Sequence, residues 1–126
     1  IDNADFNIYF HRGLAKAELQ DFRGAISDFT QAIISFPKVA NIKLFNNEDV
    51  VYAKRAYAKT MVHDNIGALK DYDKAIEFNA KNGGYFYLRG LVKLMLNQIE
   101  SGCIDLSKAG ELGESKSYDA IKTYCN

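Results

Sequence analysis

RGLAKAELQDFRGAISDFTQAIISFP, residues Arg12 to Pro37, is the stretch that decides the fold of this chain. Its apolar residues recur at helical spacing on both sides of a polar break, which predicts two amphipathic helices folded against each other. Gly13 and Ala25 are small enough to let the two backbones approach closely, and Phe29 is large enough to fill the seam. Pro37 cannot continue a helix, so the unit is a helical hairpin that ends there.

A hairpin of this size cannot bury its apolar faces alone, and its pattern returns twice further along the chain. The first helices keep an aromatic residue, an Arg, a small residue and a Lys at fixed spacing, in YFHRGLAK (Tyr9 to Lys16), YAKRAYAK (Tyr52 to Lys59) and FYLRGLVK (Phe86 to Lys93). The second helices share a small pair, an Asp and a large apolar residue, in GAISDFTQAI (Gly24 to Ile33), GALKDYDKAI (Gly67 to Ile76) and SGCIDLSKAG (Ser101 to Gly110). Three copies of the hairpin are present.

The spacing of the copies points to a known architecture. Ala56 and Gly90 are 34 residues apart, which is the tetratricopeptide period, whereas Gly13 and Ala56 are 43 apart, so the first interval carries nine extra residues. The chain resembles the tetratricopeptide repeat family over nearly its whole length. The family's pattern of aromatic, Gly, Ala, aromatic, Ala and Pro is matched in the first copy by Tyr9, Gly13, Ala25, Phe29, Ala32 and Pro37. Later copies depart from it at Asn65, Ala80 and Gly102.

The resemblance implies an all-α fold, a right-handed superhelix of three antiparallel helical hairpins with no sheet. We expect one domain over residues 1–126, with repeats at about 6–39, 49–82 and 83–114 and an insertion at about 40–48. The last segment, about 115–125, has apolar residues at helical spacing and is expected to be a helix that caps the open face of the third hairpin. The insertion carries Ile42, Leu44 and Phe45, and we favour a long loop with anchoring contacts over a dedicated binding loop.

Composition narrows the class of function. Sixteen basic and sixteen acidic residues cancel, which disfavours a nucleic-acid partner, and no apolar run approaches the length of about 20 residues that spans a bilayer. The chain begins at Ile1 rather than Met, which favours a fragment or a processed form, and the cellular compartment stays open.

Signatures of catalysis or of a cofactor are not found in the sequence. There is no HExxH, GxGxxG, GxxxxGK or GxSxG, and His11 and His63 have no nucleophile or metal-ligand cluster near them. No enzyme activity and no cofactor are therefore predicted. We expect Cys103 and Cys125, which fall in the last hairpin and the capping helix, to be two packed thiols rather than a disulfide.

A recurring Arg and Asp fall on facing helices of each hairpin and invite an ionic interpretation. The pairs are Arg12 with Asp28, Arg55 with Asp71 and Arg89 with Asp105. We interpret them as structural pairs that fix hairpin geometry, not as a binding site.

The faces of the first helices carry the functional hypothesis, because in the family these helices line a concave groove. Projection of the helical period predicts a partner-binding groove with apolar and aromatic walls, made of Phe10, Leu14, Lys54, Tyr57, Met61, Tyr87, Leu91 and Met95. Chaperone-binding members grip a carboxylate with Lys, Asn and Arg at such positions. Here Phe10, Leu14 and Leu88 occupy matching positions, so that clamp is not expected.

These observations predict a non-catalytic module that holds a peptide or helix of another protein in an apolar concave groove. The alternative is a structural spacer or self-association segment of a larger protein, which would make the chain a homo-oligomer. A helical-repeat RNA binder is a third hypothesis, which the zero net charge disfavours.

Overall fold

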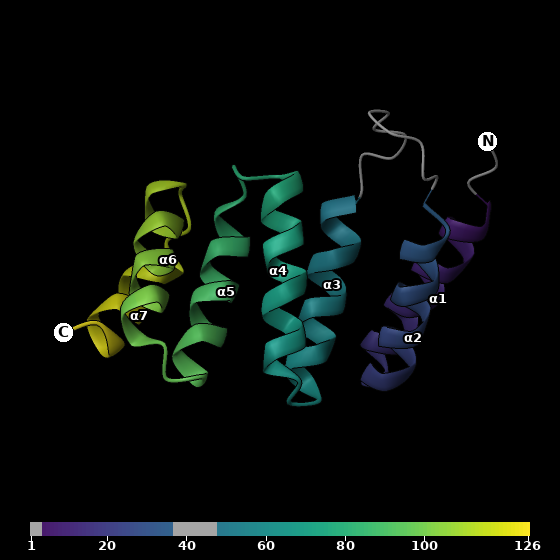
Figure 1. The fold of residues 1–126 in the computed structure, drawn as a ribbon, viewed down its shortest axis with the longest axis horizontal. Coiled ribbons are helices and arrows are strands. Elements are labelled where there is room, and N and C mark those ends of the chain that lie inside the picture. Colours follow the sequence, from purple (N-terminus) through teal and green to yellow (C-terminus); the bar gives the residue numbers. More distant parts are fainter. Residues whose placement is uncertain (1–3, 37–47) are drawn as a thin grey trace.

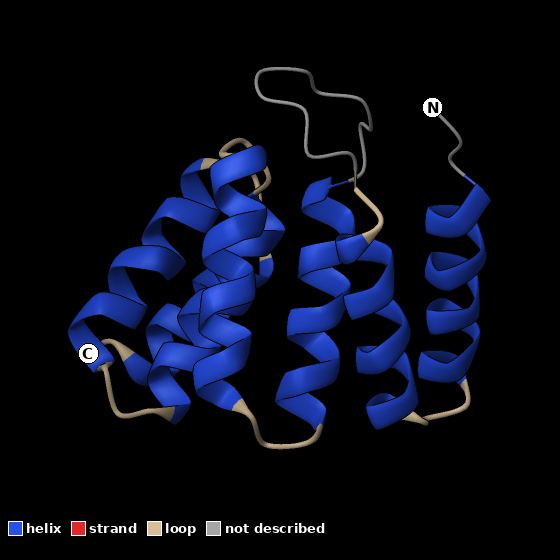
Figure 2. Cartoon of the chain, turned by 45° about the vertical axis from the view of Figure 1, so that its right-hand side comes forward, coloured by secondary structure: helices blue, strands red, loops and turns tan. Residues whose placement is uncertain are grey.

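The computed structural model describes residues 4–36 and 48–126, and this part of the chain is helical throughout except for short turns (Figures 1 and 2). It contains seven helices and no strand, as the sequence predicts. The helices are α1 (Ala4–Glu18), α2 (Phe22–Ile34), α3 (Glu48–Met61), α4 (Asn65–Phe78), α5 (Gly83–Met95), α6 (Ile99–Glu111) and α7 (Lys116–Tyr124). The insertion that the sequence places at about 40–48 lies almost entirely outside the described residues.

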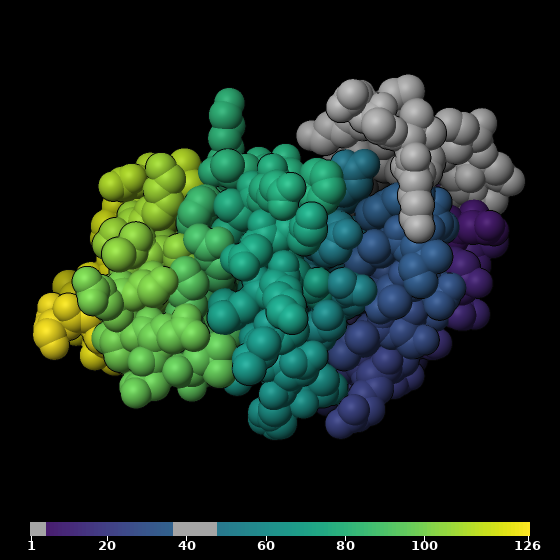
Figure 3. Space-filling view, viewed as in Figure 1, coloured from purple at the N-terminus to yellow at the C-terminus, as the bar shows by residue number. Residues whose placement is uncertain are grey.

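The helices pair into three hairpins that stand side by side in chain order, with α7 at the far end (Figure 1). The pairs are α1 with α2, α3 with α4, and α5 with α6, and each hairpin packs on the next through its second helix. In the space-filling view they form successive bands from the N-terminal to the C-terminal end (Figure 3). The third hairpin packs on α7 in the way that each earlier hairpin packs on its successor.

Small residues set the distance between the two helices of each hairpin. Ala25, Ala56 and Ala68 have no exposed surface, and Gly13 and Gly90 are also buried. In the third hairpin the two backbones are in contact, because a Cβ built on Gly90 would lie 2.9 Å from the backbone oxygen of Gly102. Gly13 and Ala25 are the positions at which the sequence predicts a close helix contact in the first hairpin, and Ala56, Ala68 and Gly90 are their counterparts in the later copies.

The turn inside each hairpin uses a residue in the left-handed backbone region. Gln20, His63 and Asn97 have φ angles of 62°, 67° and 61°. In the first turn the backbone N–H of Asp21 donates to the carbonyl of Lys16 at 2.8 Å, which closes the end of α1. The three turns share this backbone geometry although their residue types differ. The left-handed conformation costs any residue other than Gly some stability.

The core lies between the hairpins and is continued by aromatic rings at the N-terminal end. Phe29 and Val51 are fully buried, and both belong to a cluster that spans α1, α2 and α3. A second cluster joins the next two hairpins through Tyr72 and Val92. Burial raises the pKa of the Tyr72 hydroxyl, because ionisation would place a charge in this apolar interior.

Each hairpin also contains a buried Asp held by two cations from the facing helix. Asp71 accepts two hydrogen bonds of 2.7 Å from Arg55, and its carboxylate lies 3.1 Å from the Nζ of Lys59. Asp28 and Asp105 are held in the same way, by Arg12 with Lys16 and by Arg89 with Lys93.

The guanidinium of each arginine lies over an aromatic ring one turn earlier, at 5.5, 5.7 and 5.4 Å for Arg12, Arg55 and Arg89. The hydrogen bond from Arg12 lowers the pKa of Asp28 below its usual range. The ionic interpretation of the repeated Arg and Asp is thus confirmed, and the sequence missed only the part played by the lysines.

No helix in residues 4–36 and 48–126 has the length and hydropathy that crossing a membrane requires.

Candidate functional site

A depression lies between the first helices of the second and third hairpins. It has a volume of about 440 Å³ and is lined by four residues of α3 and two of α5, namely Val50, Ala53, Lys54, Tyr57, Tyr85 and Leu88. The α3 residues recur at intervals of three and four positions, so one face of that helix forms a wall. The lining is apolar and aromatic except for one ammonium group.

Tyr57 and Lys54 are the most accessible parts of this depression. Tyr57 is 48% exposed, although its ring packs edge-to-face on Phe22 of the preceding hairpin at a centroid distance of 6.3 Å. Lys54 is exposed and forms no ion pair within the described part of the chain, in contrast to Lys59 of the same helix. The site therefore offers an aromatic surface and an uncompensated positive charge side by side.

Tyr85 forms the floor of the depression rather than its rim. Its hydroxyl donates to Asp49 at 2.8 Å, and the residue is 9% exposed. Burial, reinforced by the hydrogen bond to the Asp49 carboxylate, raises the pKa of Tyr85. This bond ties the start of α3 to the start of α5, so it holds the two walls at a fixed distance.

The other predicted groove residues of α5 face the last helix. Tyr87 and Leu91 line a separate depression of about 440 Å³ together with residues of α7, among them Asp119 and Thr123. Met95 is 56% exposed and lies beside Ile99 and Tyr124 in a third depression of about 390 Å³.

The first helix differs from the prediction. Phe10 was expected in the open groove and is instead 9% exposed, with its ring 5.4 Å from Phe6 and 6.1 Å from Phe29. The reason is that Phe6 and Phe36 stack at 5.2 Å and extend the core over the N-terminal half of α1. Leu14 is half-buried and packs against the same cluster.

Among the eight residues predicted for the groove, Lys54 and Tyr57 come together at the depression between α3 and α5. Met61, which is 44% exposed, does not line that depression, and the two predicted residues of α1 lie at the first core cluster. Tyr85 is not among the residues that the sequence predicts for the groove. Its polar hydroxyl on an otherwise apolar stripe was the signal that could have found it.

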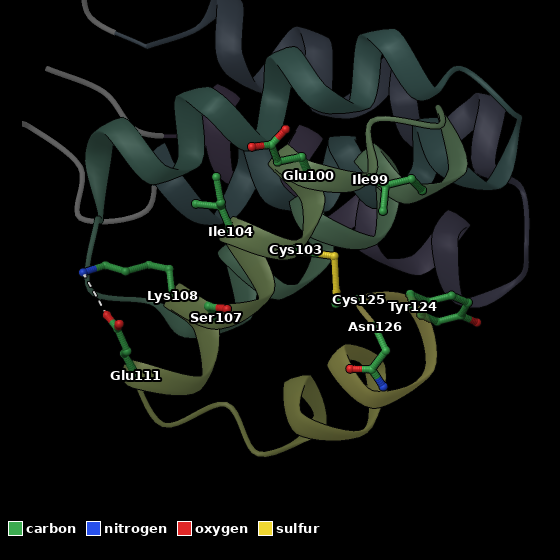
Figure 4. Close-up of a pocket in the computed structure, with 10 residues that line it drawn as sticks. All are labelled: Ile99, Glu100, Cys103, Ile104, Ser107, Lys108, Glu111, Tyr124, Cys125 and Asn126. Carbon is green, nitrogen blue, oxygen red and sulfur yellow. Dashed lines mark ion pairs between the residues drawn. A yellow bond between two sulfur atoms is a disulfide. The ribbon is translucent and has the colours of Figure 1, made fainter.

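The two cysteines also differ from the prediction. Cys103 and Cys125 form a disulfide, with their Cα atoms 5.8 Å apart, so the expectation of two packed thiols is wrong. The bond forms because α7 folds back against α6 and brings Cys125, the residue after its last turn, beside Cys103 of α6 (Figure 4). Around it lies a depression of about 770 Å³.

No group of three or more His, Cys, Asp or Glu side chains that could hold a metal ion occurs in residues 4–36 and 48–126.

Comparison with known proteins places this geometry in a class. No family model matches the chain. It is 32% identical over 104 residues to a TPR repeat-containing thioredoxin, TDX, of Arabidopsis thaliana, and 29% identical over 106 residues to human tetratricopeptide repeat protein 36. Each match covers 81% of this chain, but only 27% of the plant protein and 51% of the human one.

A solved structure agrees over a longer span. The first TPR domain of Spaghetti (RPAP3), bound to the HSP90 peptide SRMEEVD, superposes with a TM-score of 0.85 over 99% of this chain and 94% of that one, at 16% sequence identity. The protein is thus an all-α helical-repeat domain. More specifically, its three hairpins are tetratricopeptide repeats, stacked as a right-handed superhelix, and α7 is their C-terminal capping helix.

Proposed function

We propose that this domain is a non-catalytic interaction module that binds a peptide or helix of another protein. The observation that carries the proposal is the depression between α3 and α5, with Tyr57 standing 48% exposed beside it. Exposed aromatic rings next to a concave apolar surface supply contact area at low entropic cost, which is typical of protein-binding sites.

The lining defines what the depression would accept. Val50, Tyr57 and Leu88 surround a space suited to an apolar side chain, and Lys54 offers its charge to a carboxylate of the same segment. The HSP90 peptide SRMEEVD, bound in the similar structure of Spaghetti, shows that this fold can hold a short segment. Here the positions that would carry a basic clamp are Phe10, Leu14 and Leu88, so the contact would be mainly apolar.

A second candidate is self-association through the outer face of α6. Ile104 and Ile99 on this face are 64% and 43% exposed, and a second copy could cover them. Light scattering over a range of concentrations separates this candidate from the first, because only self-association raises the mean mass with concentration.

Selection from a random peptide display library on the purified domain tests the proposal. We expect selected peptides to share an apolar residue beside an acidic one, and Tyr57→Ala or Leu88→Ala to weaken their binding at least about tenfold, the loss of a central contact. Ile66→Ala, at a 64% exposed site on α4, is the matched control and should bind as the parent does. Binding that ignores Tyr57→Ala would overturn the proposal.

A further inference from the structure

The Cys103–Cys125 disulfide stands in an open, largely apolar depression rather than in the core. Both cysteines are partly exposed, and the depression around them is lined by Ile99, Ile104 and Tyr124 together with polar residues of α6. Figure 4 shows the bond crossing from the middle of α6 to the end of α7, with the surrounding side chains set around it. The disulfide therefore borders an open depression rather than being enclosed by the core.

Apart from the disulfide, helix α7 is held by few buried residues. It has nine residues, fewer than the 12 to 15 or so at which an isolated helix begins to persist, and only Ser117 and Ala120 are buried. Its N-cap Ser115 forms no side-chain capping bond, and Tyr118 reaches the carbonyl of Gly110 at a long 3.4 Å. By comparison, α4 buries four residues and begins with a capping Asp.

The helix is held at its two ends by different means. At its start the chain turns at Gly113, where φ is 97°, and Ser117 donates to the carbonyl of Glu114 at 2.7 Å. At its end Cys125 is the C-cap residue, and the disulfide fixes it to α6. Breaking the disulfide removes the anchor at the end that the chain connection does not hold.

We propose that Cys103–Cys125 is a thiol–disulfide exchange site, and that its reduction by a dithiol releases α7. A thiolate of the dithiol attacks one sulfur, the Cys103–Cys125 bond breaks, and the departing sulfur leaves as a thiolate that takes up a proton. The second thiol of the reductant then attacks the mixed disulfide. Two electrons and two protons reach this chain, both cysteines become thiols, and the dithiol becomes a disulfide.

Release of α7 would change the apolar surface of α5. Tyr87 and Leu91 share a depression with residues of α7, and they become more exposed when that helix leaves. The exchange site would in this way lengthen the apolar surface available to a partner, a consequence that rests on the proposed function. The release of the helix itself does not depend on any partner.

Hydrogen exchange with mass spectrometry on the whole chain tests the release. After treatment with dithiothreitol or with a thioredoxin, and quantification of free thiols, we expect amides of residues 116–124 to exchange about tenfold faster or more, since a local constraint is lost. Amides of α3 and α4 should keep their rates. Reduction by thioredoxin would identify a protein dithiol as a competent electron donor. Reduction by dithiothreitol alone would identify a small dithiol as the donor.

A variant with Cys103→Ser and Cys125→Ser should show the fast exchange of α7 without any reductant. Ser107→Ala, in the same depression, is the matched control and should behave as the parent in both redox states. Resistance of the bond to both dithiols under native conditions overturns the proposal. So does unchanged exchange of α7 after reduction, or a loss of protection that extends to α3 and α4, and none of these readouts requires a bound peptide.

Discussion

The second and third hairpins follow the same plan but bring their helices together differently. Ala56 and Ala68 occupy the small positions of the second hairpin, whereas Gly90 and Gly102 occupy them in the third. Without the two methyl groups the backbones of α5 and α6 come within contact of each other, so a Cβ on either glycine would lie about 3 Å from the other's carbonyl oxygen. The comparison teaches that one repeat pattern accepts either Ala or Gly at its two small positions, and that the backbones of the third hairpin are in contact because both are Gly.

The same two hairpins also differ at the start of their second helices. Asp64 caps α4 by accepting a hydrogen bond from the backbone of Gly67 at 3.0 Å, while Gln98 at the start of α6 makes no side-chain capping bond. The third hairpin has a disulfide from α6 to α7 instead. Local capping and a long-range covalent bond thus occur in different repeats.

The largest expected effect concerns the buried Asp with its Arg and Lys, which the second and third hairpins share. Asp71→Asn and Asp105→Asn each leave an Arg and a Lys without their buried counter-charge, so each should lower the free energy of unfolding by about 3–5 kcal/mol. Urea denaturation followed by circular dichroism measures this loss.

The control for these variants is Asp73→Asn, because Asp73 is 61% exposed and meets Arg89 at the surface. Its cost should stay at or below about 1 kcal/mol. A loss below about 1 kcal/mol for Asp71→Asn or Asp105→Asn would contradict a stabilising role of the buried carboxylate that both hairpins share.

The next largest effect tests the difference in helix packing between the second and third hairpins. Gly90→Ala places a methyl group against the backbone of Gly102 and should cost about 1–3 kcal/mol, because backbone cannot move aside as a side chain can. Ala56→Gly in the second hairpin should cost about 1–2 kcal/mol, because it loses helix propensity and a fully buried methyl group. A Gly90→Ala protein with an unchanged urea midpoint would contradict the close approach.

A smaller effect concerns the turns. His63→Gly should stabilise the protein by about 0.5–1 kcal/mol, because Gly adopts a φ of 67° without the penalty of a Cβ, partly offset by a more flexible unfolded chain. Asn97→Gly should gain less, since Asn tolerates the left-handed region well. Thermal unfolding midpoints compare the two, and a larger gain for Asn97→Gly would count against this explanation.

The smallest expected effect concerns the difference in N-terminal capping between α4 and α6. Gln98→Asp supplies the side-chain acceptor that α6 lacks and should stabilise the protein by about 0.5 kcal/mol or more. Gln98→Asn is a neutral comparison with the same capping geometry but no charge. If neither variant raises the urea midpoint, the end of α6 is already satisfied by other groups.

The repeated spacing was sufficient to predict the hairpins, because Gly13, Ala56 and Gly90 can only recur in that way if a close helix contact recurs. The Arg and Asp pairs followed from the same logic, since a separation of 16 residues between Arg12 and Asp28 returns unchanged in the later copies. Local periodicity of this kind is a property of single helices and of their immediate partners.

The repeat spacing does not predict the surroundings of Phe10 or the pairing of the two cysteines. A helical projection gives α1 two apolar sides, but it does not say which side the rings of Phe6 and Phe36 will cover. Cys103 and Cys125 are separated by 22 residues, a number that leaves their distance in space undetermined. Both outcomes depend on how an end of the stack is closed, and a repeat pattern contains no information about its own ends.

The arginines of the later hairpins carry a further consequence. Arg55 also donates to Thr30 of the preceding hairpin at 3.1 Å, and Arg89 donates to Asp73 of the preceding hairpin at 2.9 Å. In a nearest-neighbour description of a repeat array, one side chain thus contributes to both the intrinsic stability of a hairpin and its coupling to the hairpin before it. Cooperativity between neighbours is thereby built into the repeating unit, so that a hairpin which opens in the middle of the stack also weakens the interface that its arginine had bridged.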